Sequence, residues 1–354
     1  MYLCTLFNDS IMIKTVIAGP CSVESREQLR QITAALSAMP RVSLIRAGVW
    51  KPRTRPGGFE GLGEPALQWM QELAQEYGVQ YCCEVARPEH VELCQRYGVT
   101  TVWIGARTTG NPFMVEELCS ALAGSGMTVL VKNPTSPDVS LWLGAIERVL
   151  QAGVDSVGAV HRGFSMYHNQ GYRNAPLWEV PMTLRREMPE IPLLCDPSHI
   201  GGRSDLVAQL ANTAAQFDYD GLMVEVHPDP ESALTDVPQQ LTPAAFADLL
   251  SSLPSVASHL SPVTSQQLIP LRRQIDEIDH ELLSLLARRM EMSRQISFIK
   301  RELQMPVYQS NRWADVVADR MEQAAALGLD ADFTRALLEK IHGESIRVQL
   351  ADEA

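Results

Sequence analysis

Short apolar segments alternate with amphipathic segments over most of the chain, and this alternation restricts the fold more than any other feature. The apolar segments are rich in Val, Ile and Leu and predict strands, whereas the segments between them repeat with the period of a helix. The predicted strands are Thr15–Ala18, Val42–Val49, Gln80–Val85, Thr101–Gly105, Thr128–Lys132, Ser156–Val160, Ile191–Cys195 and Gly221–Val226. The predicted helices are Ser25–Met39, Pro65–Tyr77, Pro88–Tyr97, Pro112–Leu122, Val139–Gln151, Glu179–Arg186, Ser204–Phe217 and Pro243–Leu253.

Eight strand–helix pairs within residues 1–253 are typical of a (β/α)₈ barrel, a TIM barrel of the α/β class. A doubly wound open sheet is the alternative, but no GxGxxG motif follows the first strand. In a barrel, the residues that carry function lie at the carboxyl ends of the strands.

The alternation stops near Leu253, and a different domain follows. Residues 254–266 are rich in Ser and Pro and predict a linker. Residues 267–354 predict an all-α domain with helices at Gln267–Leu303, near Arg312–Ala326 and near Asp332–Leu350. The first of these helices is longer than helices of globular domains usually are, so its apolar positions predict packing against a second subunit. These positions are Leu271, Ile275, Ile278, Leu282, Leu285, Leu286, Met290, Ile296 and Ile299.

Charge and composition exclude several classes of partner. The 354 residues include 30 Lys and Arg against 42 Asp and Glu, and the net charge of −12 argues against nucleic acid or an anionic membrane as partner. No apolar run approaches the length of a membrane span, and the amino terminus lacks the basic start of a signal peptide. Seven cysteines without the spacing of a disulfide framework favour a reducing compartment, and we expect a cytoplasmic protein.

One basic segment stands out against this acidic background. The sequence IRAGVWKPRTR at residues 45–55 places Arg46 inside an apolar run and then adds Lys51, Arg53 and Arg55 in a loop stiffened by prolines. A solvated basic loop is the simpler interpretation. Cations this close repel each other unless an anion lies among them, and guanidinium groups match phosphate and carboxylate geometry. We therefore predict a site for small anionic substrates.

Other predicted strands also end in residues that can bind a metal ion or an anion. One set, with a thiol, an imidazole and two carboxylates, suits a divalent metal ion of the Mn, Fe, Co or Zn class. It comprises Cys21, His199, Glu225 and Asp236, with Asp196 and His227 as alternative ligands. The other set is cationic and suffices for two phosphates and a carboxylate. It comprises Arg46, Lys51, Arg53, Arg107, Lys132 and Arg162.

The barrel resembles type I 3-deoxy-D-arabino-heptulosonate-7-phosphate (DAHP) synthases. The motifs are GPCSVE (19–24), KPRT (51–54), IGARTT (104–109), VKN (131–133), HRG (161–163), DPSHIGGR (196–203) and VEVHPDP (224–230). The 3-deoxy-manno-octulosonate-8-phosphate synthases share the barrel and the GPC start, but they carry an Asn-containing loop in place of KPRT. The resemblance therefore favours DAHP synthase.

The resemblance implies a role for each matching position. Phosphoenolpyruvate would be held by Arg46, Lys51, Arg107, Lys132 and Arg162, and erythrose 4-phosphate by Arg53 and Thr54. The metal ligands would be Cys21, His199, Glu225 and Asp236. The metal would polarise the aldehyde, Lys51 would protonate the new alkoxide, and Glu84 would help to position the attacking water.

Residues 267–351 resemble the all-α chorismate mutases, which rearrange chorismate to prephenate without a cofactor. Arg289 and Lys300 share a helix face, because 11 residues rotate by only about 20° net. The resemblance implies that these two residues and Gln349 act on the reacting ether and carboxylates. It also implies that Arg312 and Ser345 bind the substrate, and that Arg272 completes the site of the other subunit of a homodimer.

Two positions depart from the mutase pattern. Gln309 and Trp313 occupy positions where many members carry carboxylates for the substrate hydroxyl. An alternative is therefore a dimerising, ligand-sensing domain with little catalysis. In either case, residues 1–13 are too short for a regulatory domain, so we expect feedback by prephenate or chorismate to act through the helical domain.

Overall fold

The computed structural model describes residues 13–51, 57–167, 171–253 and 262–351. The chain divides into two compact units, Met1–His259 and Leu260–Ala354. No helix in the described ranges is both long and apolar enough to cross a membrane.

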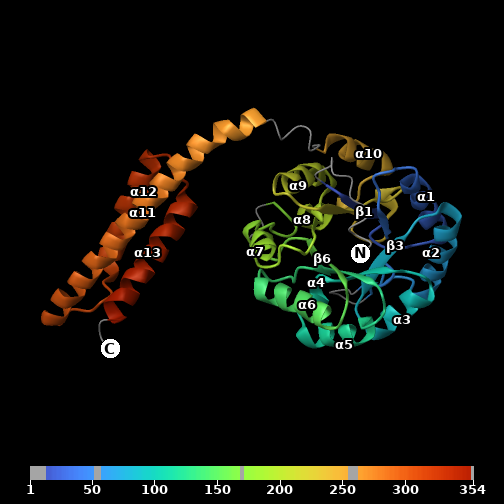
Figure 1. Ribbon diagram of the computed structural model, residues 1–354, viewed down its shortest axis with the longest axis horizontal. Coiled ribbons are helices and arrows are strands. Elements are labelled where there is room, and N and C mark those ends of the chain that lie inside the picture. The colour runs from blue at the N-terminus through green and yellow to red at the C-terminus, as the bar shows by residue number, and fades with distance from the viewer. Residues whose placement is uncertain (1–12, 52–56, 168–170, 254–261, 352–354) are drawn as a thin grey trace. The chain divides into compact units, whose positions relative to one another are not determined.

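Eight parallel strands close into a single barrel in sequence order, which confirms the predicted fold (Figure 1). The barrel closes where β1 pairs with β8, and the register there places Gly19 opposite Glu225. Nearly every strand residue is buried, because helices cover the outside and side chains fill the inside. The strands are β1 (Thr15–Gly19), β2 (Leu44–Arg46), β3 (Tyr81–Val85), β4 (Thr101–Ile104), β5 (Thr128–Lys132), β6 (Ser156–His161), β7 (Leu193–Cys195) and β8 (Gly221–Glu225).

The helices of the barrel unit surround the strands (Figure 1). Several begin where the sequence supplies a cap: the side chains of Ser25, Asp138 and Thr242 each accept a hydrogen bond from a backbone N–H of the first turn. The helices are α1 (Arg26–Ser37), α2 (Glu64–Tyr77), α3 (Pro88–Arg96), α4 (Ala106–Thr109), α5 (Pro112–Leu122), α6 (Val139–Gln151), α7 (Glu179–Glu187), α8 (Pro197–Gly201), α9 (Ser204–Gln216) and α10 (Pro243–Ser252). Two 3₁₀ turns follow β8, namely η1 (Pro230–Ser232) and η2 (Val237–Gln239).

The second strand is shorter than predicted. The sequence predicts a strand over Val42–Val49, but β2 covers only Leu44–Arg46. Beyond Arg46 the chain crosses the loop that follows β1, where Gly48 O accepts from Val23 N at 2.8 Å. A Cβ atom on Gly48 would lie 2.0 Å from the Cys21 carbonyl oxygen, so the glycine permits this close crossing. Helices α4 and α8 were not predicted, because four or five residues are too few to show a helical period.

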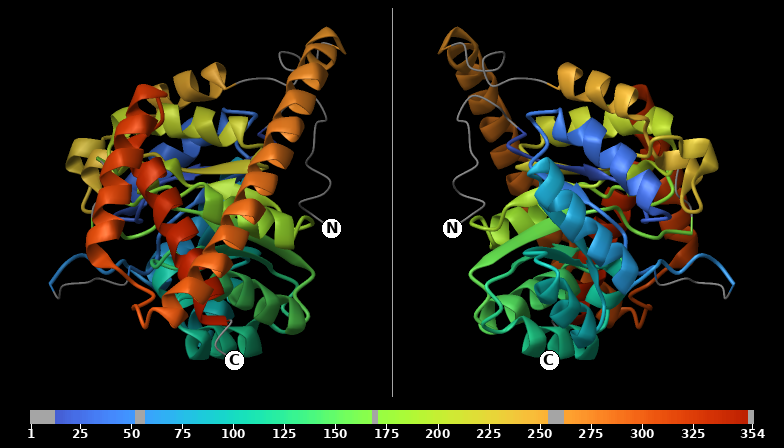
Figure 2. Two further views of the ribbon diagram at one scale, coloured as in Figure 1. Left: turned by 90° about the vertical axis from the view of Figure 1, so that its left-hand side faces the viewer. Right: turned by 90° about the vertical axis from the view of Figure 1, so that its right-hand side faces the viewer.

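Three helices form the second unit: α11 (Pro262–Glu302), α12 (Ser310–Ala326) and α13 (Ala331–Ala351). Helix α13 lies beside both of the others, as Figure 2 also shows. The long helix begins at Pro262 rather than at Gln267, so the last part of the predicted 254–266 linker is helical.

The long helix α11 leaves its apolar face uncovered in the single chain. Every position from Leu268 to Leu285 is exposed. Apolar residues with exposed fractions of 47–56% recur at alternating spacings of four and three, apart from one gap of seven between Leu285 and Met292, and this is the pattern of a coiled-coil seam. They are Leu271, Ile275, Ile278, Leu282, Leu285, Met292, Ile296 and Ile299.

Candidate active sites

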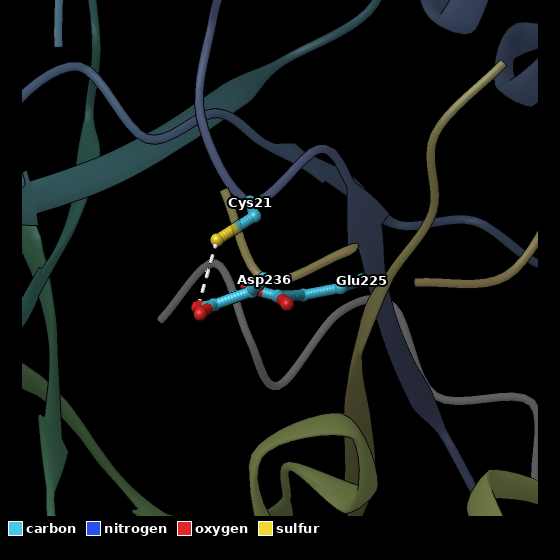
Figure 3. A group of neighbouring side chains, drawn as sticks. All are labelled: Cys21, Glu225 and Asp236. Atoms are coloured by element: carbon cyan, nitrogen blue, oxygen red, sulfur yellow. Dashed lines mark hydrogen bonds between the residues drawn. The ribbon is translucent and has the colours of Figure 1, made fainter. Parts of the chain in front are cut away.

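Three metal-capable side chains from different segments meet at the carboxyl end of the barrel (Figure 3). Cys21 follows β1, Glu225 ends β8, and Asp236 lies at the start of η2 with φ of 49°. One ligand atom from each lies within 4.8 Å of the others, and Cys21 Sγ is 3.1 Å from Asp236 Oδ2. Among the described residues, these three side chains are the group whose ligand atoms lie this close together.

His199 lies beside this group. It belongs to α8, where Asp196 caps the helix by accepting from His199 N at 3.0 Å. Its Nδ1 lies 2.8 Å from Asp196 Oδ2 and its Nε2 lies 3.7 Å from Glu225 Oε1. A carboxylate on one ring nitrogen orients the other nitrogen, as in carboxylate–histidine–metal arrangements.

These donors fit a divalent ion. Burial, together with the charge of Glu225, raises the pKa of the Cys21 thiol far above its ordinary value, and a cation among the donors would reverse that effect. Glu225 Oε1 is buried and makes no hydrogen bond, although Arg46 Nη2 lies 3.0 Å away. A thiolate, an imidazole and two carboxylates suit the Mn, Fe, Co or Zn class.

The alternative ligands are engaged in other contacts. Asp196 accepts from Lys132 Nζ at 2.8 Å as well as from His199 N. His227 Nδ1 accepts from Asp229 N, and its Nε2 lies 3.6 Å from Glu24 Oε2. Asp196 therefore orients His199. Both ring nitrogens of His227 contact residues outside the cluster.

A cavity of about 630 Å³ opens beside the cluster and has a cationic lining. Lys51, Arg107, Lys132 and Arg162 line it, together with His199, Asp236 and the predicted Glu84. Lys51 Nζ donates to Cys21 Sγ at 2.7 Å, so this lysine stands between the cluster and the cavity.

The cations of this lining favour an anionic ligand. Burial, together with the nearby charges of Arg173 and Arg107, lowers the pKa of Arg162 to about 10. The repulsion between such close like charges is reduced when an anion binds among them.

Arg46 has a different position from the other cations. It is 1% exposed and lies among Glu225, Asp196 and Trp103 rather than on the cavity lining. Arg53 and Thr54, predicted to bind the second phosphate, lie outside the described residues.

Trp103 lies beneath the site and is 1% exposed. Its ring centroid is 5.1 Å from Arg46 Cζ and 5.4 Å from Lys132 Nζ, which are cation–π distances. Its indole Nε1 donates to Glu84 Oε2 at 3.1 Å. One buried ring therefore supports two cations and one carboxylate of the site.

The helical unit brings together several of its predicted site residues between α11 and α13. Arg289 donates to Ser345 Oγ, and Gln349 Nε2 donates to Ser345 O at 3.2 Å. Lys300 Nζ donates to Val307 O. The Gln349 side chain is 8% exposed, and its Oε1 is buried without a hydrogen-bond partner.

Trp313, one of the two positions that depart from the mutase pattern, packs against α13. The Trp313 ring stacks on His342 with centroids 3.8 Å apart. Burial, and then the charges of Arg289 and Lys300, lower the pKa of His342.

The other predicted mutase residues lie apart from this group. Arg272 and Arg312 are exposed, the first on the uncovered part of α11 and the second on α12. An exposed arginine on a long apolar helix is free to reach a second copy of the chain.

Sequence reasoning missed several residues that contact the barrel site. Trp103, Arg173, Gln239 and Gln240 act through long-range contacts that no local spacing reveals. The one available signal was the place of Trp103 within a predicted strand.

Comparisons with known proteins give matches for both units. The model of the DAHP synthetase I family matches residues 12–261, and that of chorismate mutase type II matches residues 271–350. The chain is 34% identical to phospho-2-dehydro-3-deoxyheptonate aldolase of Thermotoga maritima over 246 residues, which are 70% of each chain.

Two further comparisons concern the barrel. The chain is 25% identical to 2-dehydro-3-deoxyphosphooctonate aldolase of Azoarcus sp. over 260 residues, which are 68% of this chain and 90% of that one. A crystal structure of phospho-2-dehydro-3-deoxyheptonate aldolase (DAHP synthase) from Thermotoga maritima matches with a TM-score of 0.61 and 34% identity, and covers 67% of each chain.

Proposed function

The chain belongs to the DAHP synthetase I family and carries a chorismate mutase type II domain after its barrel, and from this premise we propose its substrates and the role of each site residue. It is an enzyme with two catalytic domains. The barrel condenses phosphoenolpyruvate with erythrose 4-phosphate and water to give DAHP and phosphate. The helical domain rearranges chorismate to prephenate.

The observation that carries the barrel's proposal is the contact between a metal-capable cluster and a cationic cavity. Lys132, Arg162 and Arg107 supply the charge to hold the phosphate and carboxylate of phosphoenolpyruvate. Arg46 lies beneath, paired with Glu225, and contributes positive potential rather than a direct contact on the lining. Arg53 and Thr54 are proposed to bind the phosphate of erythrose 4-phosphate.

The chemistry of the barrel divides among three groups. A divalent ion held by Cys21, His199, Glu225 and Asp236 would supply Lewis-acid polarisation of the aldehyde carbonyl. Lys51 stands between these donors and the cavity, where its ammonium group can give a proton to the developing alkoxide. Glu84, held by the Trp103 indole, orients the water that attacks the adjacent carbon.

A substrate comparison tests this assignment. The eight-carbon product of the octulosonate synthases requires a five-carbon acceptor. We expect release of phosphate from phosphoenolpyruvate with erythrose 4-phosphate to exceed that with arabinose 5-phosphate by at least about 10²-fold. A preference for the pentose phosphate would assign the barrel to the octulosonate reaction.

The helical domain's proposal rests on the contacts that Arg289 and Gln349 both make with Ser345, and on Lys300 of the same unit. The charges of Arg289 and Lys300 would hold the two carboxylates of chorismate and stabilise the charge that grows on the ether oxygen. The buried, unpartnered Gln349 Oε1 marks a polar atom available to a ligand. Arg289→Ala should abolish chorismate consumption without changing the barrel's rate.

One observation favours a second function for this domain. Trp313 stacks on His342 and occupies a position where a carboxylate for the substrate hydroxyl is expected. A domain that binds chorismate or prephenate through its two carboxylates but turns chorismate over slowly would serve as a dimerising ligand sensor. Tight binding of prephenate without consumption of chorismate would identify this function.

The exposed seam of α11 supports a homodimer. Eight apolar residues at coiled-coil spacing are about half exposed in the single chain. Full burial of an exposed Leu, Ile or Met is worth about 1.5–3 kcal/mol, so burial of each of these half-covered residues would contribute about half of that. Pairing of two copies would also bring Arg272 of one copy towards the site of the other.

We further propose that prephenate or chorismate bound to the helical domain inhibits the barrel. Such coupling requires that the ligand bind two arrangements of the chain with different affinity. The test is the rate of phosphoenolpyruvate consumption with and without prephenate. A fall that disappears in Arg289→Ala supports feedback through this domain, whereas an unchanged rate excludes prephenate as the inhibitor.

A further inference from the structure

Two neighbouring glutamines lie beneath the metal-capable cluster. Gln239 ends η2 and Gln240 follows it, and their exposed fractions are 0% and 2%. Buried amides are retained where their hydrogen bonds are satisfied, so the partners of these two side chains indicate their purpose. The partners lie on or next to three of the four candidate ligands.

Gln239 connects Glu225 with Asp236. Its Nε2 donates to Glu225 Oε2 at 2.6 Å, and its Oε1 accepts from Arg173 Nη1 at 2.5 Å. The same Arg173 nitrogen lies 3.1 Å from Asp236 Oδ1. The amide thus fixes one oxygen of Glu225 and leaves Oε1 without a hydrogen bond beside the cluster.

Gln240 connects Cys21 with the segment that carries Asp236. Its Oε1 accepts from Cys21 N at 3.0 Å, and its Nε2 donates to Thr235 O at 2.9 Å. The backbone after it is fixed to β8, because Leu241 N donates to Glu225 O and His227 N donates to Leu241 O. The two amides therefore extend from a rigid support.

The charges of the cluster explain why such a support is needed. Glu225 and Asp236 are both carboxylates, and each raises the pKa of the Cys21 thiol, so the donors repel one another when they are ionised. An amide can hold a carboxylate oxygen or a backbone N–H without adding a charge that would compete with a cation. The two amides therefore fix the donors without adding another cation to Arg46, Lys51 and Arg173, which already lie beside them.

We propose that Gln239 and Gln240 are positioning residues that hold Cys21, Glu225 and Asp236 at metal-binding separations before the ion arrives. The proposal rests on the proposed function, because it assumes that this cluster binds the divalent ion of the barrel. Outer contacts of this kind typically change metal affinity by about 10–100-fold.

Titration of the metal-free full chain with Co²⁺ tests the proposal. Binding is followed by the thiolate-to-cobalt absorption band, and the band is assigned to Cys21 by its loss in Cys21→Ala. In Gln239→Leu and Gln240→Leu, we expect the dissociation constant for Co²⁺ to rise about 10–100-fold. Gln240→Leu should also weaken the band itself, because it releases the Cys21 backbone.

Matched variants separate positioning from damage to the fold. Gln209→Leu makes the same change on the exposed face of α9 and should bind Co²⁺ like the wild type. Gln239→Asn and Gln240→Asn keep the amide but shorten it by one methylene, and they should also lose affinity. The melting temperature without metal verifies that each variant is folded.

The outcomes distinguish the positioning role of the two glutamines from the proposed metal-dependent function. Weaker Co²⁺ binding in folded variants, with Gln209→Leu unchanged, supports the proposal. Wild-type affinity in Gln239→Leu and Gln240→Leu overturns it and leaves the proposed function intact. A wild-type chain that shows no Cys21-dependent band overturns the metal-dependent reaction, and the positioning role with it.

Discussion

At the scale of single residues, Asp196 organises the charges of the barrel site. It is fully buried, accepts from Lys132 Nζ at 2.8 Å and lies 2.8 Å from His199 Nδ1. Burial alone would raise its pKa, but His199, Lys132 and Arg46 together hold that pKa well below its usual range. The ionised carboxylate thus fixes a candidate ligand and a substrate-binding cation at once.

Gly105 controls the position of Glu84. A Cβ atom there would lie 2.1 Å from Glu84 Oε1, although the backbone at φ of −72° accepts any residue. Gly105→Ala should therefore move the carboxylate and lower the rate of DAHP formation on the order of 10²-fold. Steady-state assay of phosphoenolpyruvate consumption measures this effect.

Gly110 is the matched control for this substitution. It closes the same short helix, and an added Cβ atom would meet its nearest neighbour at 3.8 Å. Gly110→Ala should retain the wild-type rate. Equal rates for the two alanine variants would show that the position of Glu84 does not matter to the reaction.

His161 should make the barrel less stable in mild acid. Its Nε2 donates to Pro176 O, so the neutral ring accepts from Tyr219 at Nδ1, and burial lowers its pKa from 6.5 to about 3. The unfolded chain therefore binds more protons between these values, and stability falls as the pH decreases from 6.5. At pH 5, which is 1.5 pH units below 6.5, the loss from this group is about 2 kcal/mol.

Urea unfolding between pH 5 and 7.5 measures this loss. His161→Gln keeps a donor for Pro176 O but does not titrate, so its stability should depend less steeply on pH. His280→Gln, at an exposed position of α11, should keep the wild-type dependence. If His161→Gln and the wild type lose stability in parallel, the acid sensitivity arises elsewhere.

At the scale of secondary-structure elements, the sequence predicts what depends on local periodicity and misses what depends on distant contacts. Strand periodicity located Lys132 and Glu225 at strand ends, because parallel barrel strands all end at one rim. It could not reveal the contacts of Gln239, since these join η2 to β8 and to the loop that carries Arg173. The Trp313–His342 stack between α12 and α13 was hidden for the same reason.

The exposed seam of α11 makes a prediction about assembly. Ile278 and Leu282 are 56% and 52% exposed and lie one turn apart on the seam. Ile278→Asp with Leu282→Asp should place four carboxylates in the interface of a dimer and convert it to monomers. Light scattering coupled to gel filtration measures the mass.

Glu281→Lys changes the charge of the same helix turn without altering an apolar seam position, and it should remain dimeric. The aspartate variant should also lose chorismate turnover, because Arg272 would no longer reach the other copy. A wild-type chain that is already monomeric, or an aspartate variant that is still dimeric, would exclude this seam as the interface.

At the scale of the whole molecule, the two units carry different chemistry. The group of three metal-capable side chains found among the described residues lies entirely in the barrel unit. The helical unit groups arginine, lysine and amide side chains instead, which suit a rearrangement driven by electrostatic stabilisation. The two activities of one chain should therefore respond differently to metal.

Removal of metal should abolish the activity of the barrel and leave the activity of the helical domain unchanged. After dialysis against a chelator, we expect phosphoenolpyruvate consumption to fall at least about 10²-fold and to return on addition of Mn²⁺ or Co²⁺, because the aldehyde is no longer polarised. Chorismate consumption by the same sample should be unchanged, which also verifies that the protein is intact. Cys21→Ala should reproduce the chelated state without any chelator. If chorismate consumption fell in parallel with the barrel's rate, metal would support the whole chain rather than one site, and the division of chemistry between the two units would be wrong.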